Sequence, residues 1–399
     1  MPFCVSLCPY CDFVVFAGAD ARGPRARVAA FVAALAAEIG LRADALDARF
    51  GGPGGAARPP LETVYLGGGT PTLLPGDAVA GLVALVRARF GIADGAEVTI
   101  EANPGADERG DARALAAAGV TRVSLGAQSF DPGLLSRLGR RHRPGDVAEA
   151  VAEARAAGIG SVALDLLYDV PGQALRTWAE TLDRALELAP DHVSAYALTL
   201  DDPDAEGLTG PLGDHLPTRP GARRWREAAA GEQDDDRAAA QYALAVERLG
   251  AAGYRGYEIS NWARPGHESR HNLVYWRRRP HEAVGPGAHA FDGVRRRWNA
   301  ARLDGYLAAL APGGARPASP PPGGHEVVNA AAAQAEAVIL ALRLDAGLAL
   351  DETRTGPLAP HLDWAITAGL LEPFDGPEPR VRLTTRGRLL SNELFARLV

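Results

Sequence analysis

The chain has 399 residues, 47% hydrophobic and 23% charged, which is enough for two or three domains around a large core. Its formal net charge of −7 and pI of about 5.8 argue against nucleic acid as the main partner. No apolar run approaches the roughly 20 residues of a membrane-spanning helix, and the polar, cysteine-rich start does not resemble a signal peptide. We therefore expect a cytoplasmic protein without a transmembrane segment, for which peripheral contact with a membrane remains open.

Helical and strand-like patterns alternate from about residue 25. The first helix is expected around residues 28–39, where apolar residues recur at helical spacing, and a Gly/Pro-rich break follows. The predicted strands are 63–66, 97–101, 122–125, 161–167 and 192–200. The amphipathic segments between them are 77–90, 107–118, 131–138, 144–157 and 174–189. This alternation predicts an α/β fold with a partial parallel (β/α) barrel and functional residues where the strands end.

The pattern loosens after residue 200. Residues 201–236 are rich in Asp, Pro, Gly and Arg and are expected to form a long excursion, followed by a helix at 237–252 and a strand at 254–259. A Pro/Gly-rich linker is expected at 311–325. We predict three parts, which are a core at 1–200, an extension completing one side of the barrel at 201–310, and a small, mostly helical domain at 326–399.

All three cysteines lie in the first eleven residues. Cys4, Cys8 and Cys11 form a C-x3-C-x2-C motif, with Pro9 preventing a regular helix. Three thiolates hold three irons of a [4Fe–4S] cubane and leave the fourth iron open. That iron can chelate the amino and carboxylate groups of S-adenosylmethionine. A structural zinc site is the alternative, but its usual paired knuckles or histidine pair are missing from this spacing.

Further polar or flexible residues occur where predicted strands end. They are Gly68, Gly69 and Thr70 in a Gly-Gly-Gly-Thr-Pro turn, Glu101 before Asn103-Pro104, Gln128, and Asp165. A glycine-rich backbone lets a ligand approach closely, although a tight turn explains it equally well. Glu101 could bind ribose hydroxyls or an ammonium group, or it could cap a turn. The buried polar residues need partners, either from a ligand or from a neighbouring strand. In the basic run 140–143, one arginine could reach a ligand carboxylate.

Two aromatic-dense stretches stand out in a chain with only 6% aromatics. They are residues 257–262 and 271–276, the second reading His-Asn-Leu-Val-Tyr-Trp. A flat apolar tetrapyrrole needs aromatic walls, and His271 could be an axial ligand. A hydrogen-bonded core cluster is the alternative.

Seven motifs occur in one order along the chain. They are Pro2-Phe3-Cys4 with C-x3-C-x2-C, Gly-Gly-Gly-Thr-Pro, Glu-Ala-Asn-Pro, Ser-x-Gly-x-Gln-Ser-Phe, Asp-Leu-x-Tyr-x-x-Pro-Gly-Gln, Tyr-Glu-Ile-Ser-Asn and His-Asn-x-x-Tyr-Trp. In this order the chain resembles the oxygen-independent coproporphyrinogen III oxidase family of radical SAM proteins. The similarity runs from Pro2 to about His289.

The resemblance distinguishes two branches. The true oxidase carries a fourth cysteine, giving C-x3-C-x2-C-x-C, and here that position is Phe13. With the His-Asn-x-x-Tyr-Trp stretch, this departure makes the chain similar to the heme-chaperone branch, which binds heme and delivers it to apo-hemoproteins. The resemblance implies S-adenosylmethionine contacts at seven positions and heme binding near His271. The seven positions are Gly68, Gly69, Thr70, Glu101, Gln128, Arg140 and Asp165.

One feature departs from the family pattern. Relatives carry a strand ahead of the cysteine loop, whereas this chain begins Met1-Pro2-Phe3-Cys4. Either the barrel lacks its first strand, or the residues that form it lie upstream of Met1. As written, the chain is expected to retain the cluster and S-adenosylmethionine less firmly than a full-length relative.

Three functions follow from these patterns. The first is a heme chaperone with a cluster, an S-adenosylmethionine site and an electron donor. The second is coproporphyrinogen oxidative decarboxylation to protoporphyrinogen IX, and the third is radical SAM chemistry on another substrate. Substrate choice depends on pocket shape, which the sequence does not give.

Overall fold

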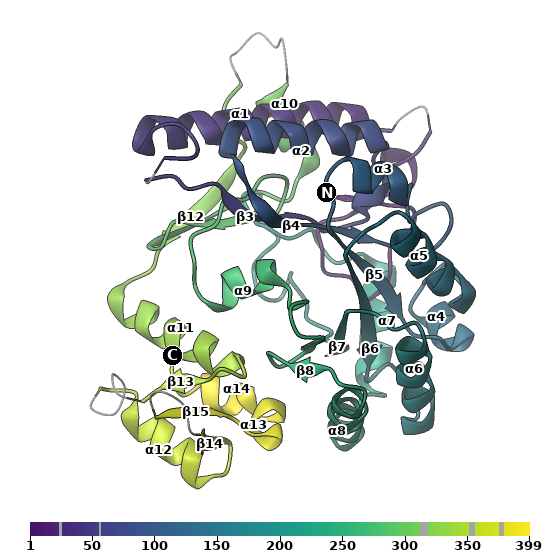
Figure 1. Ribbon diagram of the computed structural model, residues 1–399, viewed down its shortest axis with the longest axis vertical. Helices are drawn as coiled ribbons and strands as arrows, with labels where there is room; N and C mark the ends of the chain where they lie inside the picture. The colour runs from purple at the N-terminus through teal and green to yellow at the C-terminus, as the bar shows by residue number, and fades with distance from the viewer. Residues whose placement is uncertain (24–25, 56, 312–317, 351–355, 375–378) are drawn as a thin grey trace.

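A parallel sheet with helices on its outer side forms most of the molecule, as seen in a computed structural model (Figure 1). The structure describes residues 1–399 except 24–25, 56, 312–317, 351–355 and 375–378. The sheet has seven strands in the order β3-β4-β5-β6-β7-β9-β8. Their bounds are β3 Leu61–Leu66, β4 Ile92–Ala102, β5 Arg122–Gln128, β6 Ser161–Tyr168, β7 His192–Ala197, β9 Asn261–Ala263 and β8 Arg255–Gly256. The first five strands run parallel, which confirms the predicted α/β fold class.

Helices connect these strands and cover their outer face (Figure 1). They are α1 Val28–Phe50, α2 Gly76–Phe90, α3 Ala112–Ala117, α4 Pro132–Arg137, α5 Pro144–Ala156, α6 Leu175–Glu187 and α8 Asp235–Ala251. α3 is shorter than the predicted segment at 107–118, because Asp111 caps its first turn by accepting from the backbone N–H groups of Arg113 and Ala114.

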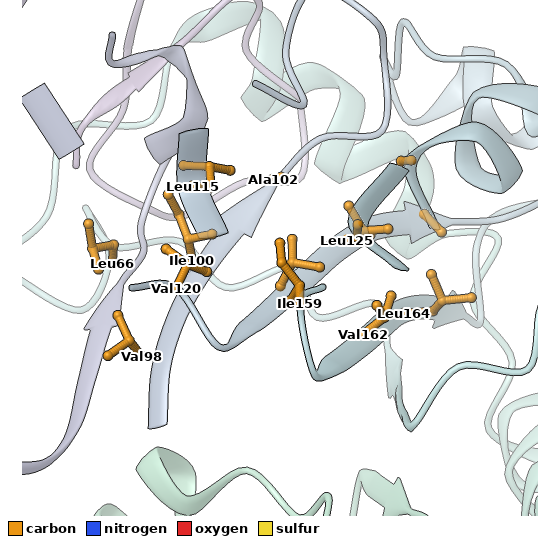
Figure 2. Close-up of a cluster of buried hydrophobic side chains, with 14 of the residues drawn as sticks. Leu66, Val98, Ile100, Ala102, Leu115, Val120, Leu125, Ile159, Val162 and Leu164 are labelled. Atoms are coloured by element: carbon orange, nitrogen blue, oxygen red, sulfur yellow. The ribbon is translucent and has the colours of Figure 1, made fainter. Parts of the chain in front are cut away.

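Alternation along the strands separates a core face from a cavity face. Val98, Ile100 and Ala102 of β4 point toward the helices and pack near Leu115 and Val162 (Figure 2). The residues between them point the other way, since successive side chains of a strand alternate. The outer face is therefore the hydrophobic core, and the inner face is left to polar residues.

Shorter elements complete this part of the chain. They are β1 Phe3–Cys4, β2 Phe16–Ala17, the 3₁₀ turns Gly18–Asp20 and Pro71–Leu73, α7 Pro220–Ala230, α9 Arg270–Trp276, β10 His289–Phe291, β11 Arg295–Asn299, α10 Leu303–Leu310 and β12 Gly323–Val327. β1 pairs with β2, outside the seven-stranded sheet. α9 lies within the curve of the sheet (Figure 1) and contacts β3.

The end of the chain has a hydrophobic core of its own. Its elements are α11 Ala330–Arg343, β13 Leu348–Ala349, α12 Ala359–Thr367, β14 Leu371–Phe374, β15 Arg380–Leu383, α13 Thr385–Leu389 and α14 Ser391–Phe395. Val338, Leu362 and Val381 are buried together there. β15 pairs with both β13 and β14.

Two local predictions differ from the structure, and a third lies partly outside the described residues. The segment 254–259 is a two-residue strand and a turn, because the chain bends back so that Gly256 pairs with Trp262. The excursion at 201–236 contains the helix α7, which the polar composition concealed. The linker expected at 311–325 includes residues 312–317, which lie outside the described residues.

Candidate functional site

Two neighbouring cavities open on the inner face of the sheet. The first, of about 280 Å³, is lined by the cysteine loop and by polar residues of β4 to β7. The second, of about 720 Å³, is lined by β3, α9 and the segment 279–289. Phe13, Tyr65 and Gly68 line both cavities, so the two sites share a wall.

The cysteine loop forms one wall of the first cavity. Cys4 ends β1, and the backbone N–H of Cys11 donates to the carbonyl of Cys8 at 3.2 Å, which closes a turn. All three cysteines are free thiols that line this cavity. The three cysteines therefore lie along one cavity, and their role as cluster ligands stays a prediction.

Burial affects the acidity of these thiols. It raises the pKa of Cys4 to about 11 and that of Cys11 to about 12. Both thiols are consequently protonated at neutral pH in the metal-free protein, and iron must displace their protons on binding.

The cavity offers thiols and polar groups that fit a cubane cluster. Among the described residues, no three His, Cys, Asp or Glu side chains converge on one ion. In a [4Fe–4S] cluster the cysteines bind different irons, so their sulfurs need not converge. Polar groups also reach the sulfurs, since Thr70 Oγ1 lies 3.3 Å from Cys4 Sγ and Arg140 Nη1 lies 3.8 Å from Cys8 Sγ. The donor set and its surroundings therefore fit a cluster.

A backbone hydrogen bond joins the glycine-rich turn to β1, the strand that leads into the cysteine loop. Thr70 N–H donates to the carbonyl of Phe3 at 2.7 Å. A Cβ on Gly69 would lie 2.6 Å from that carbonyl oxygen, so only glycine fits. Gly68 has φ +111°, a left-handed conformation that also favours glycine. The turn thus places bare backbone beside the thiols.

Glu101 points into the first cavity from β4. Its Oε1 accepts from the Tyr65 hydroxyl at 2.6 Å and its Oε2 from the Gly68 N–H at 2.8 Å. Burial raises the pKa of Glu101, while these two hydrogen bonds act in the opposite direction. The two carboxylate oxygens therefore accept hydrogen bonds from β3 and from the glycine turn, while the side chain also lines the cavity.

Arg140 and Asn103 cross the first cavity. Arg140 Nη2 donates to Asn103 Oδ1 at 2.5 Å and to the Gly126 carbonyl at 2.6 Å. Asn103 Nδ2 in turn donates to Thr70 Oγ1 at 3.0 Å. The predicted positions Thr70 and Arg140 are therefore joined by one hydrogen-bond network, which includes Asn103.

Gln128 and Asp165 complete the predicted set. Gln128 has φ +61° where β5 ends, and its Oε1 accepts from the Tyr196 hydroxyl at 2.9 Å. Asp165 accepts from Ser124 Oγ at 3.1 Å. Burial, and then the charge of Glu101, raises the pKa of Asp165 to about 7. Protein partners thus satisfy both side chains while each still lines the cavity.

The remaining members of the basic run have other partners, although Arg141 and His142 also line the first cavity. Arg141 pairs with Asp107 at 3.6 Å on the surface. His142 is buried against the Ala127 carbonyl, and burial lowers its pKa to about 4. Arg143 precedes α5, so Arg140 is the member of the run that reaches the cysteine loop.

His271 belongs to the second cavity. Its Nδ1 lies 2.9 Å from Thr63 Oγ1 and its Nε2 lies 2.8 Å from the Tyr275 hydroxyl. Its ring stacks on Tyr65 with centroids 4.9 Å apart. Tyr275 lines the cavity, whereas Trp276 lies under the guanidinium of Arg343 at 4.2 Å. Of these two aromatic side chains, Tyr275 therefore forms part of the cavity wall and Trp276 does not.

Sequence reasoning missed an important residue of the cysteine loop. Arg226 of α7 is buried, and it donates through Nε to the Pro9 carbonyl at 3.1 Å and through Nη2 to the Cys11 carbonyl at 3.0 Å. Arg226 thereby joins α7 to the cysteine loop through two backbone carbonyl groups. A buried arginine in a segment that looked irregular gave no local signal of this role.

A barrel of parallel strands whose rim gathers a C-x3-C-x2-C loop, a glycine turn and buried carboxylates defines a radical SAM protein. The model of the radical SAM superfamily matches residues 1–185. The chain belongs to the HemW family of heme chaperones within that superfamily. The heme chaperone HemW of Mycobacterium tuberculosis is 40% identical over 399 residues, covering 100% of this chain and 93% of the relative. The heme chaperone HemW of Escherichia coli is 35% identical over 289 residues, which cover 72% of this chain and 68% of the relative.

The fold has a solved counterpart. The structure of coproporphyrinogen III oxidase (HemN) from Escherichia coli aligns over 100% of this chain and 88% of its own, with a TM-score of 0.76 and 22% identity. This likeness concerns the fold alone. Membership of the superfamily implies a [4Fe–4S] cluster and S-adenosylmethionine. Among the described residues, no helix is long and apolar enough to cross a membrane.

Proposed function

We propose that this chain is a heme chaperone, which binds heme in the 720 Å³ cavity and transfers it to apo-hemoproteins. The observation that carries the proposal is this large cavity, lined by Val274, Tyr275 and three histidines, beside the cysteine loop. Pockets of about 300–1,000 Å³ with mostly apolar walls and few polar groups suit ligands of this class. The relatives named above are heme chaperones.

In this proposal Cys4, Cys8 and Cys11 hold the cluster. S-adenosylmethionine lies against the glycine turn and the cavity-facing polar residues. The turn supplies Gly68, Gly69 and Thr70, and the cavity-facing polar residues are Glu101, Gln128, Arg140 and Asp165. The carboxylates would attract its cationic amino group, and Arg140 would face its carboxylate. When bound, the cluster would supply an electron from an external donor. We place this function in the cytoplasm, because reduced thiols need a reducing compartment.

Phe13 favours the chaperone over coproporphyrinogen oxidation. It occupies the position of the fourth cysteine of the oxidase motif and is 64% exposed. Phe13 lines both cavities, so it places an apolar side chain where the oxidase motif has a thiol.

Two assays on the anaerobically reconstituted protein test the proposal. Heme-loaded protein mixed with an apo-cytochrome should transfer heme, and His271→Ala should weaken heme loading. With coproporphyrinogen, S-adenosylmethionine and a reductant, we expect no protoporphyrinogen. Catalytic formation of protoporphyrinogen without heme transfer would assign the chain to the oxidase function instead.

A further inference from the structure

Three histidines line the proposed heme cavity, and their hydrogen bonds differ. They are His271, His281 and His289. Both ring nitrogens of His271 are engaged, by Thr63 and by Tyr275. An iron ligand needs a nitrogen with an available lone pair, so His271 would have to give up a hydrogen bond before it could bind iron.

His281 meets the requirement as it stands. Its backbone exchanges hydrogen bonds with Phe291 at 2.8 and 2.9 Å, which fixes the position of the residue. Its Nδ1 lies 3.1 Å from the carbonyl oxygen of Arg279. Because a carbonyl only accepts, Nδ1 must carry the proton, and the lone pair is on Nε2. Among the described residues, Nε2 has no hydrogen-bond partner.

The surroundings of His281 suit a neutral ligand. Burial lowers its pKa, which keeps the imidazole uncharged at neutral pH. The edge of Tyr275 packs against its ring with centroids 4.8 Å apart, and the Phe291 ring lies 6.3 Å away. Metal-binding histidines typically donate their second ring N–H to a carbonyl or carboxylate, which fixes the ring and its tautomer.

His289 is placed differently. Its Nε2 lies 2.7 Å from Oδ2 of Asp214, and its ring stacks on Trp298 with centroids 6.1 Å apart. The nitrogen that remains is Nδ1, which is adjacent to the residue's own Cβ and backbone. A wide macrocycle reaches Nε2 of a histidine more easily than Nδ1, so His289 is the weaker candidate.

We propose that His281 is the axial ligand of the heme iron through Nε2, and that His271 is a positioning residue. His271 packs between Tyr65 and Tyr275, and Tyr275 in turn contacts His281. This assignment rests on the proposed heme-binding function and names the atom that would contact the metal.

The test uses full-length, cluster-loaded protein under anaerobic conditions, so that the three thiols are not available to heme. One equivalent of hemin is added and reduced, and the iron–histidine stretching band is recorded by resonance Raman spectroscopy. We expect this band in the wild type and its loss in His281→Ala. Heme dissociation from the variant should be faster by at least about tenfold. Added imidazole should restore the band, because it can enter the space left by the ring.

His289→Ala is the matched control, since it removes an imidazole from the same cavity and should keep the band. His281→Gln gives a second variant of similar size, and iron content and S-adenosylmethionine binding report whether each variant is folded. If the wild type binds heme and His281→Ala keeps its band, the assignment is wrong while the proposed function stands. If the wild type shows no saturable heme binding, the proposed function itself fails.

Discussion

The Tyr65 hydroxyl donates to Oε1 of Glu101 at 2.6 Å, while the ring of Tyr65 stacks on His271 at 4.9 Å. One side chain of β3 therefore touches both the buried carboxylate of the cysteine cavity and the histidine of the larger cavity. Because Tyr65 lines both cavities, it physically connects the two proposed ligand sites.

Tyr65→Phe should remove the hydrogen bond to Glu101 and keep the ring contact with His271. The change removes a hydrogen bond that the carboxylate of Glu101 accepts and that lowers its pKa. A hydrogen bond to a charged group is worth about 1.5–3 kcal/mol, which corresponds to a loss of roughly tenfold to a hundredfold in S-adenosylmethionine affinity. Heme affinity should change less, because the ring stays on His271. Equilibrium dialysis with both ligands, beside Tyr275→Phe as control, measures this. Equal losses for both ligands would contradict it.

Asp165 should make stability depend on pH. Its pKa rises from 3.8 to about 7 in the folded protein, first because of burial and then because of the charge of Glu101. Between those values the native state holds a proton that the unfolded chain has released, so its contribution to the free energy of unfolding falls as pH rises through this window. Asp165→Asn lacks this titration. The difference in free energy of unfolding between the variant and the wild type should therefore favour the variant more at pH 8 than at pH 4. Urea unfolding of both proteins without ligands tests this, and a difference independent of pH would refute it.

Thr70 should influence how firmly the cluster is held. Its hydroxyl contacts Cys4 Sγ at 3.3 Å and lowers the pKa of that thiol against the effect of burial. Thr70→Val should raise the pKa further and leave the sulfur without this contact, so iron content after reconstitution should fall and loss to a chelator should quicken several-fold. Thr70→Ser, which keeps the hydroxyl, should behave like the wild type. Identical chelation rates in both variants would show that the contact has no such role.

The metal-free thiols should react slowly. Since burial raises the pKa of Cys4 to about 11 and that of Cys11 to about 12, little thiolate is present at pH 8. Alkylation by iodoacetamide, followed by mass spectrometry of the N-terminal peptide, should be slow at pH 8 for both residues and accelerate steadily to pH 10. Rates already at their maximum at pH 8 would contradict the effect of burial.

The sequence was sufficient to predict the strands that carry the first cavity and several of the residues that line it. Alternation along β4 and β6 separates Ile100 and Leu164, which pack in the core, from Glu101 and Asp165, which face the cavity. Spacing alone brought the three cysteines together, because C-x3-C-x2-C requires a short loop. These features are local, so a single sequence reveals them.

Features that depend on tertiary contact were not predictable. Arg226 reaches the cysteine loop from α7, in a segment whose polar composition resembled a coil. The stacking of Tyr65 on His271 joins β3 to α9, and no periodicity relates them. The second cavity, likewise, results from how α9 and the segment 279–289 lie against β3.

The most direct measurement is an anaerobic hemin titration of the cluster-loaded wild type beside Val274→Trp, which fills the larger cavity from α9. Val327→Trp is the matched control, because Val327 is 61% exposed on β12, outside the cavity lining. Near-ultraviolet circular dichroism and iron content verify folding. We predict a saturable Soret shift at about one heme per chain in the wild type and the control, and its loss in Val274→Trp. Undiminished binding in Val274→Trp, or no saturable binding in the wild type, would contradict heme binding in this cavity.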